Sequence, residues 1–344
     1  MDIDLATQMN LKVEKIIDLN IVDFATDNSL YGGRLGIAIF YIYYAQYSNI
    51  QHYYDVGIEI IKRIITDLNR QKYSDPFQLA QLGWVLVHLK KMDLLEVKIN
   101  KVIPNLNKYL KAYSIILMKN NKYDFFQGVL AISMYFLSSE TIESKSYIKH
   151  VIKYFEDTSE IDTNSHGIKW RSLLNEGKNS FGYNISLSHG ISSILRFFTI
   201  AYEKGLMENK YELISKSINY LINQKMTNIQ SSIFPNFAIE SSTSSFESRL
   251  SWCYGDLGIS ISLLYAAKLR NEKNWEETAI SVLSHNSKRR DLITNGIIDA
   301  GFCHGTSGIS HIYNIAFKNT GLIEFSETSN FWNKKTPVRA RLIF

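Results

Sequence analysis

The sequence reads Tyr31-Gly32-Gly33-Arg34-Leu35-Gly36-Ile37-Ala38-Ile39-Phe40 where a cluster of glycines opens an apolar run. Related motifs follow at intervals of roughly 45 to 65 residues, centred on Gly83, Gly128, Gly190, Gly255 and Gly305. Recurrence at such intervals indicates a repeat architecture. Each interval has room for two helices, so we predict repeats of an outer amphipathic helix followed by an inner helix that begins at the glycines.

The segments between the glycines have the periodicity of helices. In 56–68 and in 213–222, apolar side chains recur every three or four residues. The inner segments 37–45 and 259–267 are almost continuously apolar, as expected for helices that are covered on both sides. An open stack of helix hairpins would expose one side, whereas a closed ring would cover both. We therefore predict an all-α fold, an α/α toroid in which two layers of helices form a barrel. The polar segments 157–183 and 228–247 are predicted to be surface loops.

The composition is consistent with this fold and excludes several classes of protein. Of the 344 residues, 45% are hydrophobic and only four are proline, which is typical of a globular helical protein rather than a disordered or turn-rich one. The net charge is +5 and the basic residues are scattered among acidic ones, so the sequence does not indicate binding to nucleic acid.

The sequence also predicts the compartment of the protein. Two cysteines are too few for a disulfide scaffold. The N-terminal residues Met1-Asp2-Ile3-Asp4 carry acids where a signal peptide carries bases. The longest apolar stretch, 35–45, is shorter than the roughly 20 residues that cross a bilayer. We therefore expect a cytoplasmic protein with no transmembrane segment.

Both cysteines lie in glycine-flanked motifs at the starts of predicted inner helices. Cys253 comes two residues before Gly255, and Cys303-His304 directly precede Gly305. Two thiolates and an imidazole are ligands that zinc prefers, and three protein ligands with one open position are typical of catalytic zinc. The alternative is that the cysteines are small core residues. Because both lie at equivalent points of the repeat, we favour a zinc site at Cys253, Cys303 and His304.

Three other polar residues precede inner helices and are candidates for the same site. His189 stands in Ser188-His189-Gly190 and is either a proton donor near neutral pH or a helix cap. Asp124, before Gly128, is an N-cap, an active group or both. Arg249 stands four residues before Cys253, which puts it on the same face only if the segment is a helical turn.

Together, Ser188-His189-Gly190, Trp252-Cys253-Tyr254-Gly255 and Cys303-His304-Gly305 resemble the motif set of the LanC-like lanthionine synthetases, the cyclases of lanthipeptide biosynthesis. The resemblance extends from Leu30 to about Gly321, within a single domain 1–344 whose tail, 322–344, is atypical. It implies an α/α toroid with one Zn²⁺ per chain. It also implies that the zinc ligands are Cys253, Cys303 and His304 and that the active site contains His189, Asp124, Arg249 and Tyr254.

The resemblance implies a reaction as well. A cysteine of a dehydrated precursor peptide adds to a dehydroalanine or dehydrobutyrine of the same peptide and closes a thioether ring. His189 is expected to protonate the enolate and Arg249 to stabilise its charge. Asp124 either orients a histidine or accepts the thiol proton. A lanthipeptide dehydratase and a transporter are the further partners expected.

Two other functions remain open at this point. One is a non-catalytic or truncated paralogue that carries zinc and binds a peptide or thiol without cyclising it. The other is a second kind of toroidal zinc enzyme, the protein prenyltransferase β subunit, but that class uses an Asp-Cys-His set, and the Cys-Cys-His set here disfavours it.

The sequence departs from the family pattern in three ways. Leu257 stands where the family often has proline, the second repeat around 81–85 has lost part of its glycine signature, and we count six repeats where the family usually has seven. A missing repeat would leave two apolar faces unpaired, and we expect a marginally stable protein that exposes them or covers them with its tail or a partner. The side chains concerned are Ile37, Ile39, Phe40 and Tyr43 on one face and Ile309, Ile312 and Tyr313 on the other.

Overall fold

The computed structural model describes residues 3–18, 25, 27–70, 75–95, 103–175, 180–208, 210–227, 231–240 and 247–339. The helices in these residues are α1 (Ile3–Asp18), α2 (Arg34–Ser48), α3 (Gln51–Arg70), α4 (Pro76–Lys91), α5 (Ile103–Lys119), α6 (Val129–Ser139), α7 (Ile142–Thr158), α8 (Ile191–Glu203), α9 (Tyr211–Asn223), α10 (Asp256–Arg270), α11 (Lys273–Asn286), α12 (Thr306–Thr320) and α13 (Ile323–Arg339). The strands are β1 (Glu160–Asp162), β2 (Gly167–Lys169), β3 (Ser172–Asn175) and β4 (Ser180–Gly182).

The chain divides into two compact units. The smaller unit is Val13–Ile148, and the larger unit consists of Met1–Lys12 and Lys149–Phe344. The boundaries fall inside α1 and α7, so α2 to α6 belong to the smaller unit, and α8 to α13 with the four strands belong to the larger one.

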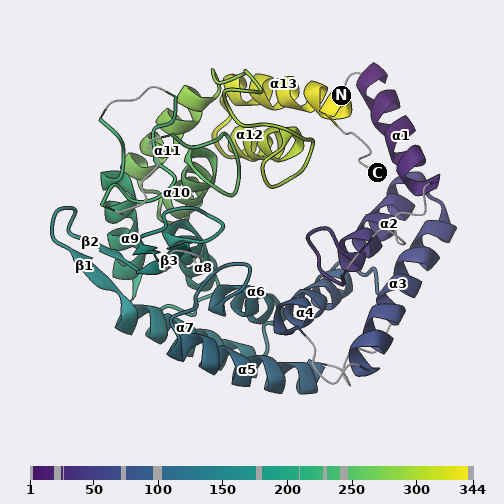
Figure 1. Cartoon of the computed structure of the whole chain (residues 1–344), viewed down its shortest axis with the longest axis horizontal. Coiled ribbons are helices and arrows are strands. Elements are labelled where there is room, and N and C mark those ends of the chain that lie inside the picture. Colours follow the sequence, from purple (N-terminus) through teal and green to yellow (C-terminus); the bar gives the residue numbers. More distant parts are fainter. Residues whose placement is uncertain are drawn as a thin grey trace. The chain divides into compact units, whose positions relative to one another are not determined.

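The smaller unit has a core formed by one face each of α2, α3 and α4. Leu35 and Ile42 from α2 pack with Ile64 from α3 and with Val85 and Leu89 from α4. Figure 1 shows α2 and α3 side by side. The expectation of an exposed face on α2 is wrong, because the α2 side chains concerned are partly buried and pack against this core: Ile37, Ile39, Phe40 and Tyr43.

One predicted helix start in the smaller unit is also wrong. Gly83 lies in the middle of α4, which begins at Pro76 after the N-cap Asp75, whose side chain accepts the N–H of Phe77. A Cβ at Gly83 would stand 2.6 Å from the ring of Tyr135 and 2.8 Å from a methyl group of Leu106. The glycine is therefore needed for close packing against α5 and α6, not for a turn.

In the larger unit, α8 packs against α9, α10 against α11 and α12 against α13 (Figure 1). The apolar face of α12 was expected to be unpaired, and this is wrong: Ile309, Ile312 and Tyr313 are 1%, 2% and 0% exposed. The helix α13, in the segment expected to be an atypical tail, covers them and buries its own Phe325 and Trp332 fully.

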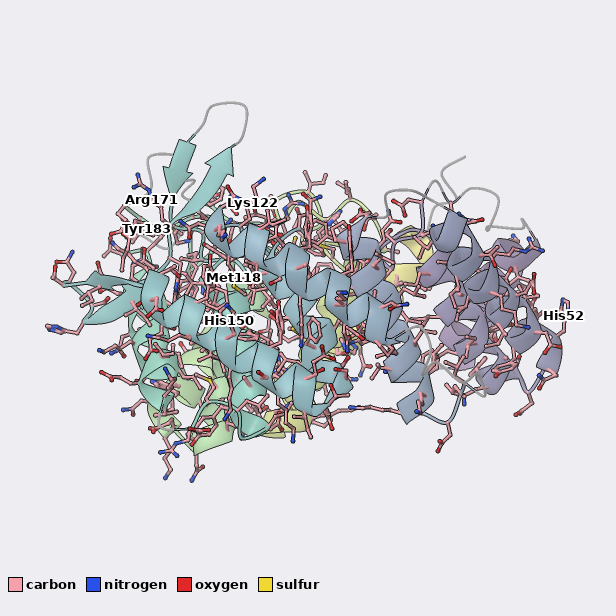
Figure 2. All side chains as sticks on the ribbon, turned by 90° about the horizontal axis from the view of Figure 1, so that it is seen from below. His52, Met118, Lys122, His150, Arg171 and Tyr183 are labelled. Atoms are coloured by element: carbon pink, nitrogen blue, oxygen red, sulfur yellow. The ribbon has the colours of Figure 1, made fainter. Side chains whose placement is uncertain are left out.

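The segment 157–183, expected to be a loop, contains two short antiparallel hairpins. In one, β1 pairs with β2, and in the other, β3 pairs with β4. Figure 2 labels Arg171 and Tyr183 at the base of the β3–β4 hairpin. Between the hairpins, Trp170 is buried and donates its indole N–H to the carbonyl of Phe155 on α7. This hydrogen bond satisfies the polar end of a large buried ring and anchors the hairpins to the helices.

The turns before three inner helices share one hydrogen-bond pattern. The side-chain oxygens of Asp27, Asn184 and Asp299 accept the backbone N–H two residues further on, at 2.7, 2.9 and 2.7 Å. The backbone carbonyls of the same three residues accept the N–H of the residue seven positions further on. That residue is the first residue of α2, α8 or α12. The residue six positions on is always the glycine N-cap of the helix.

The N-cap positions of these helices have no room for a Cβ atom, so they require glycine. A Cβ at Gly33, Gly190 or Gly305 would approach an atom of the same turn to 2.2, 2.1 or 2.3 Å. Real Cβ atoms do not make such contacts, so a larger residue would force the turn apart. Three of the repeated glycines, Gly33, Gly190 and Gly305, thus follow from a repeated turn directly before α2, α8 and α12.

Gly190→Ala is therefore expected to lower the free energy of unfolding by about 1–3 kcal/mol, the usual cost of overpacking a filled site. Its Cβ would meet the buried backbone carbonyl of Asn184, which cannot move aside. The melting temperature, compared with that of Gly301→Ala, checks this. Gly301 is exposed, and the nearest atom to its Cβ would be a side-chain oxygen of Asp299 at 3.0 Å, a much longer approach than the 2.1 Å at Gly190. Equal melting temperatures for the two variants would show that the turn has room.

Candidate metal centre

The three predicted metal ligands lie together at the surface of the larger unit. Ligand atoms of Cys253, Cys303 and His304 all lie within 4.8 Å of one another. Cys253 is buried, whereas Cys303 and His304 are half-buried. Zinc–sulfur and zinc–nitrogen bonds of about 2.3 and 2.0–2.1 Å place tetrahedral ligands a little closer than this. The donor set and its spacing therefore fit zinc after small side-chain rotations.

Backbone hydrogen bonds bring the three sequence motifs to this point. Trp252 donates its N–H to the carbonyl of Cys303 at 3.0 Å. Ser188 donates both its N–H and its hydroxyl to the carbonyl of Cys253, at 3.2 and 2.9 Å. The turns before α8, α10 and α12 are thus joined to one another through main-chain atoms, and each carries one of the motifs.

The turn that carries Cys253 depends on glycine for its backbone angles. Gly255 has a φ of +80°, which side-chain-bearing residues rarely adopt, and a Cβ there would meet the hydroxyl of Ser248 at 2.1 Å. At Gly258, one turn into α10, a Cβ would stand 2.3 Å from the carbonyl of Trp252. Both glycines let the loop that contains Cys253 pack closely against the start of α10.

The pKa values of the two thiols differ because Cys303 donates a hydrogen bond to Cys253. This hydrogen bond is the largest cause of a lowered pKa of the Cys253 thiol; burial opposes it, and Ser251 and the charge of Arg249 add to it. The same hydrogen bond, with burial, raises the pKa of the Cys303 thiol. Cys253 is therefore the thiol that ionises first, and a cation bound beside both would release the second proton.

Three predicted active-site residues lie around this cluster. The rings of His189 and Tyr254 have centroids 5.7 Å apart, and Phe237 packs edge-on against Tyr254 at 6.1 Å. The backbone N–H of His189 is held by the hydroxyl of Ser186 at 3.1 Å. Arg249 lies in an irregular loop rather than a helical turn, is exposed, and still exerts its charge on both thiols.

Asp124 belongs to the smaller unit, whereas both thiols belong to the larger one. One of its carboxylate oxygens accepts the N–H groups of Phe126 and Gln127, at 2.6 and 3.0 Å. This stabilises the turn before α6, whose N-cap is Gly128. A role of Asp124 in the active site stays a prediction.

The sequence analysis did not predict a buried polar network that stabilises the loop before α10, in which Cys253 lies. Asp256, fully buried at the start of α10, accepts the N–H groups of Ile233 and Phe234 and an amide N–H of Asn286, at 2.7–2.8 Å. Burial raises the pKa of Asp256, and these hydrogen bonds oppose that effect. An acid at the first position of a helix was the available signal.

Arg289 extends this network to the loop before Cys253. It lies 3.7 Å from the Asp256 carboxylate and donates to the carbonyl of Ser248 at 2.9 Å and to the side chain of Asn295 at 2.7 Å. The carbonyl of Asn295 in turn accepts the N–H of Leu250. The network therefore fixes both ends of the segment that contains Arg249.

Other histidines are not part of the ligand cluster. His52 on α3 and His150 on α7 are exposed (Figure 2). His311, seven residues after His304, packs its ring against Phe302 with centroids 5.2 Å apart, and burial lowers its pKa. This agrees with the interpretation that they are surface or packing residues.

Comparisons with known proteins bear on the fold and the family. A family model described as "Lanthionine synthetase C-like protein" matches residues 25–337. Among solved structures, nisin cyclase matches with a TM-score of 0.79 and 16% sequence identity, over 94% of this chain and 86% of that one. No curated protein sequence gives a significant match. The fold of the chain is that of nisin cyclase, an α/α toroid, as the sequence predicted. Within the described residues, no helix has the combination of length and apolarity needed to cross a bilayer.

Proposed function

Because the chain belongs to the lanthionine synthetase C-like family, we propose that it is a zinc-dependent cyclase that forms thioether rings in a lanthipeptide precursor. The observation that carries the proposal is the cluster of two thiols and an imidazole with His189 and Arg249 beside it. Such a cluster suits a reaction whose nucleophile is itself a thiol.

The reaction is an addition without redox change. The sulfur of a peptide cysteine forms a bond to the β-carbon of a dehydroalanine or dehydrobutyrine, and the carbon–carbon double bond is consumed. The thiol proton leaves and a proton is delivered to the α-carbon, so the mass of the peptide stays the same. The protein has to favour the thiolate and to supply that second proton.

Cys253, Cys303 and His304 are the residues that hold zinc in this proposal, with the fourth position left for the substrate. A bound zinc ion lowers the pKa of a coordinated thiol enough to deprotonate it at neutral pH. The protein ligands come from two loops that are joined by the Trp252–Cys303 hydrogen bond, which sets where the substrate sulfur lies.

His189 is the proton donor to the α-carbon, and Arg249 stabilises the enolate oxygen that precedes protonation. Tyr254 contacts the His189 ring and orients it. Arg249 is exposed and therefore available to a substrate that arrives from solvent. Asp124 is proposed to orient a histidine or to accept the thiol proton, and the two roles remain alternatives.

The substrate chemistry also defines the neighbouring steps. A dehydratase has to act before this reaction to convert serine or threonine to the dehydro amino acid. We propose that a precursor peptide, that dehydratase and an exporting transporter are the partners of the protein, which acts in the cytoplasm.

The test is to incubate the purified protein with a dehydrated peptide that contains cysteine and then to alkylate the remaining thiols. Each ring that forms removes one alkylation site, so the adduct mass falls although the peptide mass does not change. We expect adducts to disappear with the zinc-loaded protein. Zinc and peptide binding without any loss of adducts would favour the non-catalytic paralogue.

A further inference from the structure

The carboxylate of Asp299 contacts two different partners with its two oxygens. Oδ1 accepts the backbone N–H of Gly301 at 2.7 Å, in the turn before α12. Oδ2 lies 3.3 Å from Nε2 of His304. A ring whose Nε2–H is directed to a carboxylate presents Nδ1 as its acceptor, which is the atom that can bind a metal.

The turn itself does not explain the second contact. Asn184 forms the equivalent turn before α8 with a single amide oxygen, and Asp27 forms it before α2. A neutral side chain with one acceptor is therefore sufficient for the turn. The carboxylate of Asp299 has a second oxygen, Oδ2, and this oxygen lies within ion-pair distance of His304.

We propose that Asp299 is a positioning residue for the metal centre: it fixes the tautomer and orientation of His304 and strengthens the bond that Nδ1 makes to zinc. The inference rests on the zinc ligands of the proposed function. A histidine that binds metal commonly donates its other N–H to a carboxylate, and losing that partner typically weakens metal binding about 10–100-fold.

The experiment measures the zinc dissociation constant of metal-free full-length protein at pH 7, in competition with a chelating dye. Asp299→Asn retains the turn, as Asn184 does, and is expected to bind zinc about 10–100-fold more weakly. Asp27→Asn is the matched control, because it alters the same turn in the smaller unit, which carries none of the proposed zinc ligands, and it should bind zinc like the wild type.

A double-mutant cycle separates positioning from a structural effect. In a His304→Ala background, Asp299→Asn should cause no further loss of affinity. Wild-type affinity in Asp299→Asn, or an equal loss with and without His304, would overturn the inference. Zinc binding with the expected pattern but no ring formation would overturn only the cyclase function, and a wild-type protein that binds no zinc would overturn both.

Discussion

Replacing Cys303 and His304 together by alanine is expected to remove zinc from the protein and to abolish ring formation. These residues supply two of the three donor atoms, and the remaining thiol, Cys253, would be left as a single ligand. One protein ligand does not hold zinc against water or a mild chelator, because stable sites use three or four. Without the metal, a peptide thiol with an ordinary pKa near ~8.5 is mostly protonated at neutral pH.

Metal analysis after dialysis and the alkylation assay measure this prediction. Wild-type protein should hold about one zinc per chain, as a site with three protein ligands and one open position does. His311→Ala is a matched control, since it removes a histidine seven residues after His304 that packs against Phe302 and is not part of the ligand cluster. If the double variant keeps stoichiometric zinc, the ligands lie elsewhere in the chain.

His189→Asn is expected to retain zinc and to lose cyclisation by a factor of about 10²–10⁴, the usual contribution of a general acid. Its ring contacts Tyr254, whereas the ligand cluster is formed by other residues, so proton delivery and metal binding are separable. The rate and the zinc content have to be measured on the same preparation.

His166→Asn is a suitable control for this substitution. It changes an exposed histidine whose φ of 52° asparagine tolerates well. It should cyclise at the wild-type rate. Cyclisation by His189→Asn at close to that rate would show that His189 has a structural role and that another group delivers the proton.

The repeat of glycines predicted six inner helix starts, of which five are confirmed, and through them the meeting of the ligands. Equivalent points of a repeat come together because each of these inner helices begins at a glycine N-cap, and Cys253 and Cys303 both lie two residues before such a glycine. The prediction is wrong at Gly83 because glycine also serves close helix packing, and a single sequence does not distinguish the two causes. Asp75-Pro76, an N-cap followed by proline, was the better local signal for α4.

The contributions of Asp256 and Asp299 were not predictable in the same way. The partners of Asp256 are more than 20 residues away in the sequence, so its contribution depends on which loops lie opposite. The partners of Asp299, Gly301 and His304, lie in its own turn, and their contacts depend on how that turn folds. The error at α13 had a local cause. Phe325 and Trp332 stand seven residues apart, which indicates a buried helical stripe, but polar neighbours and Pro337 gave the segment the composition of a tail.

The hydrogen bond from Trp252 to Cys303 bears on how the metal arrives. It orders the two donor loops relative to each other while the chain folds, so the conformational entropy of bringing them together is already lost before an ion binds. A zinc finger differs, because there the metal drives folding and chelation unfolds the domain. For the zinc site proposed here, we therefore expect that a chelator removes the ion without unfolding the protein, so that loading and loss are exchange events of the folded chain.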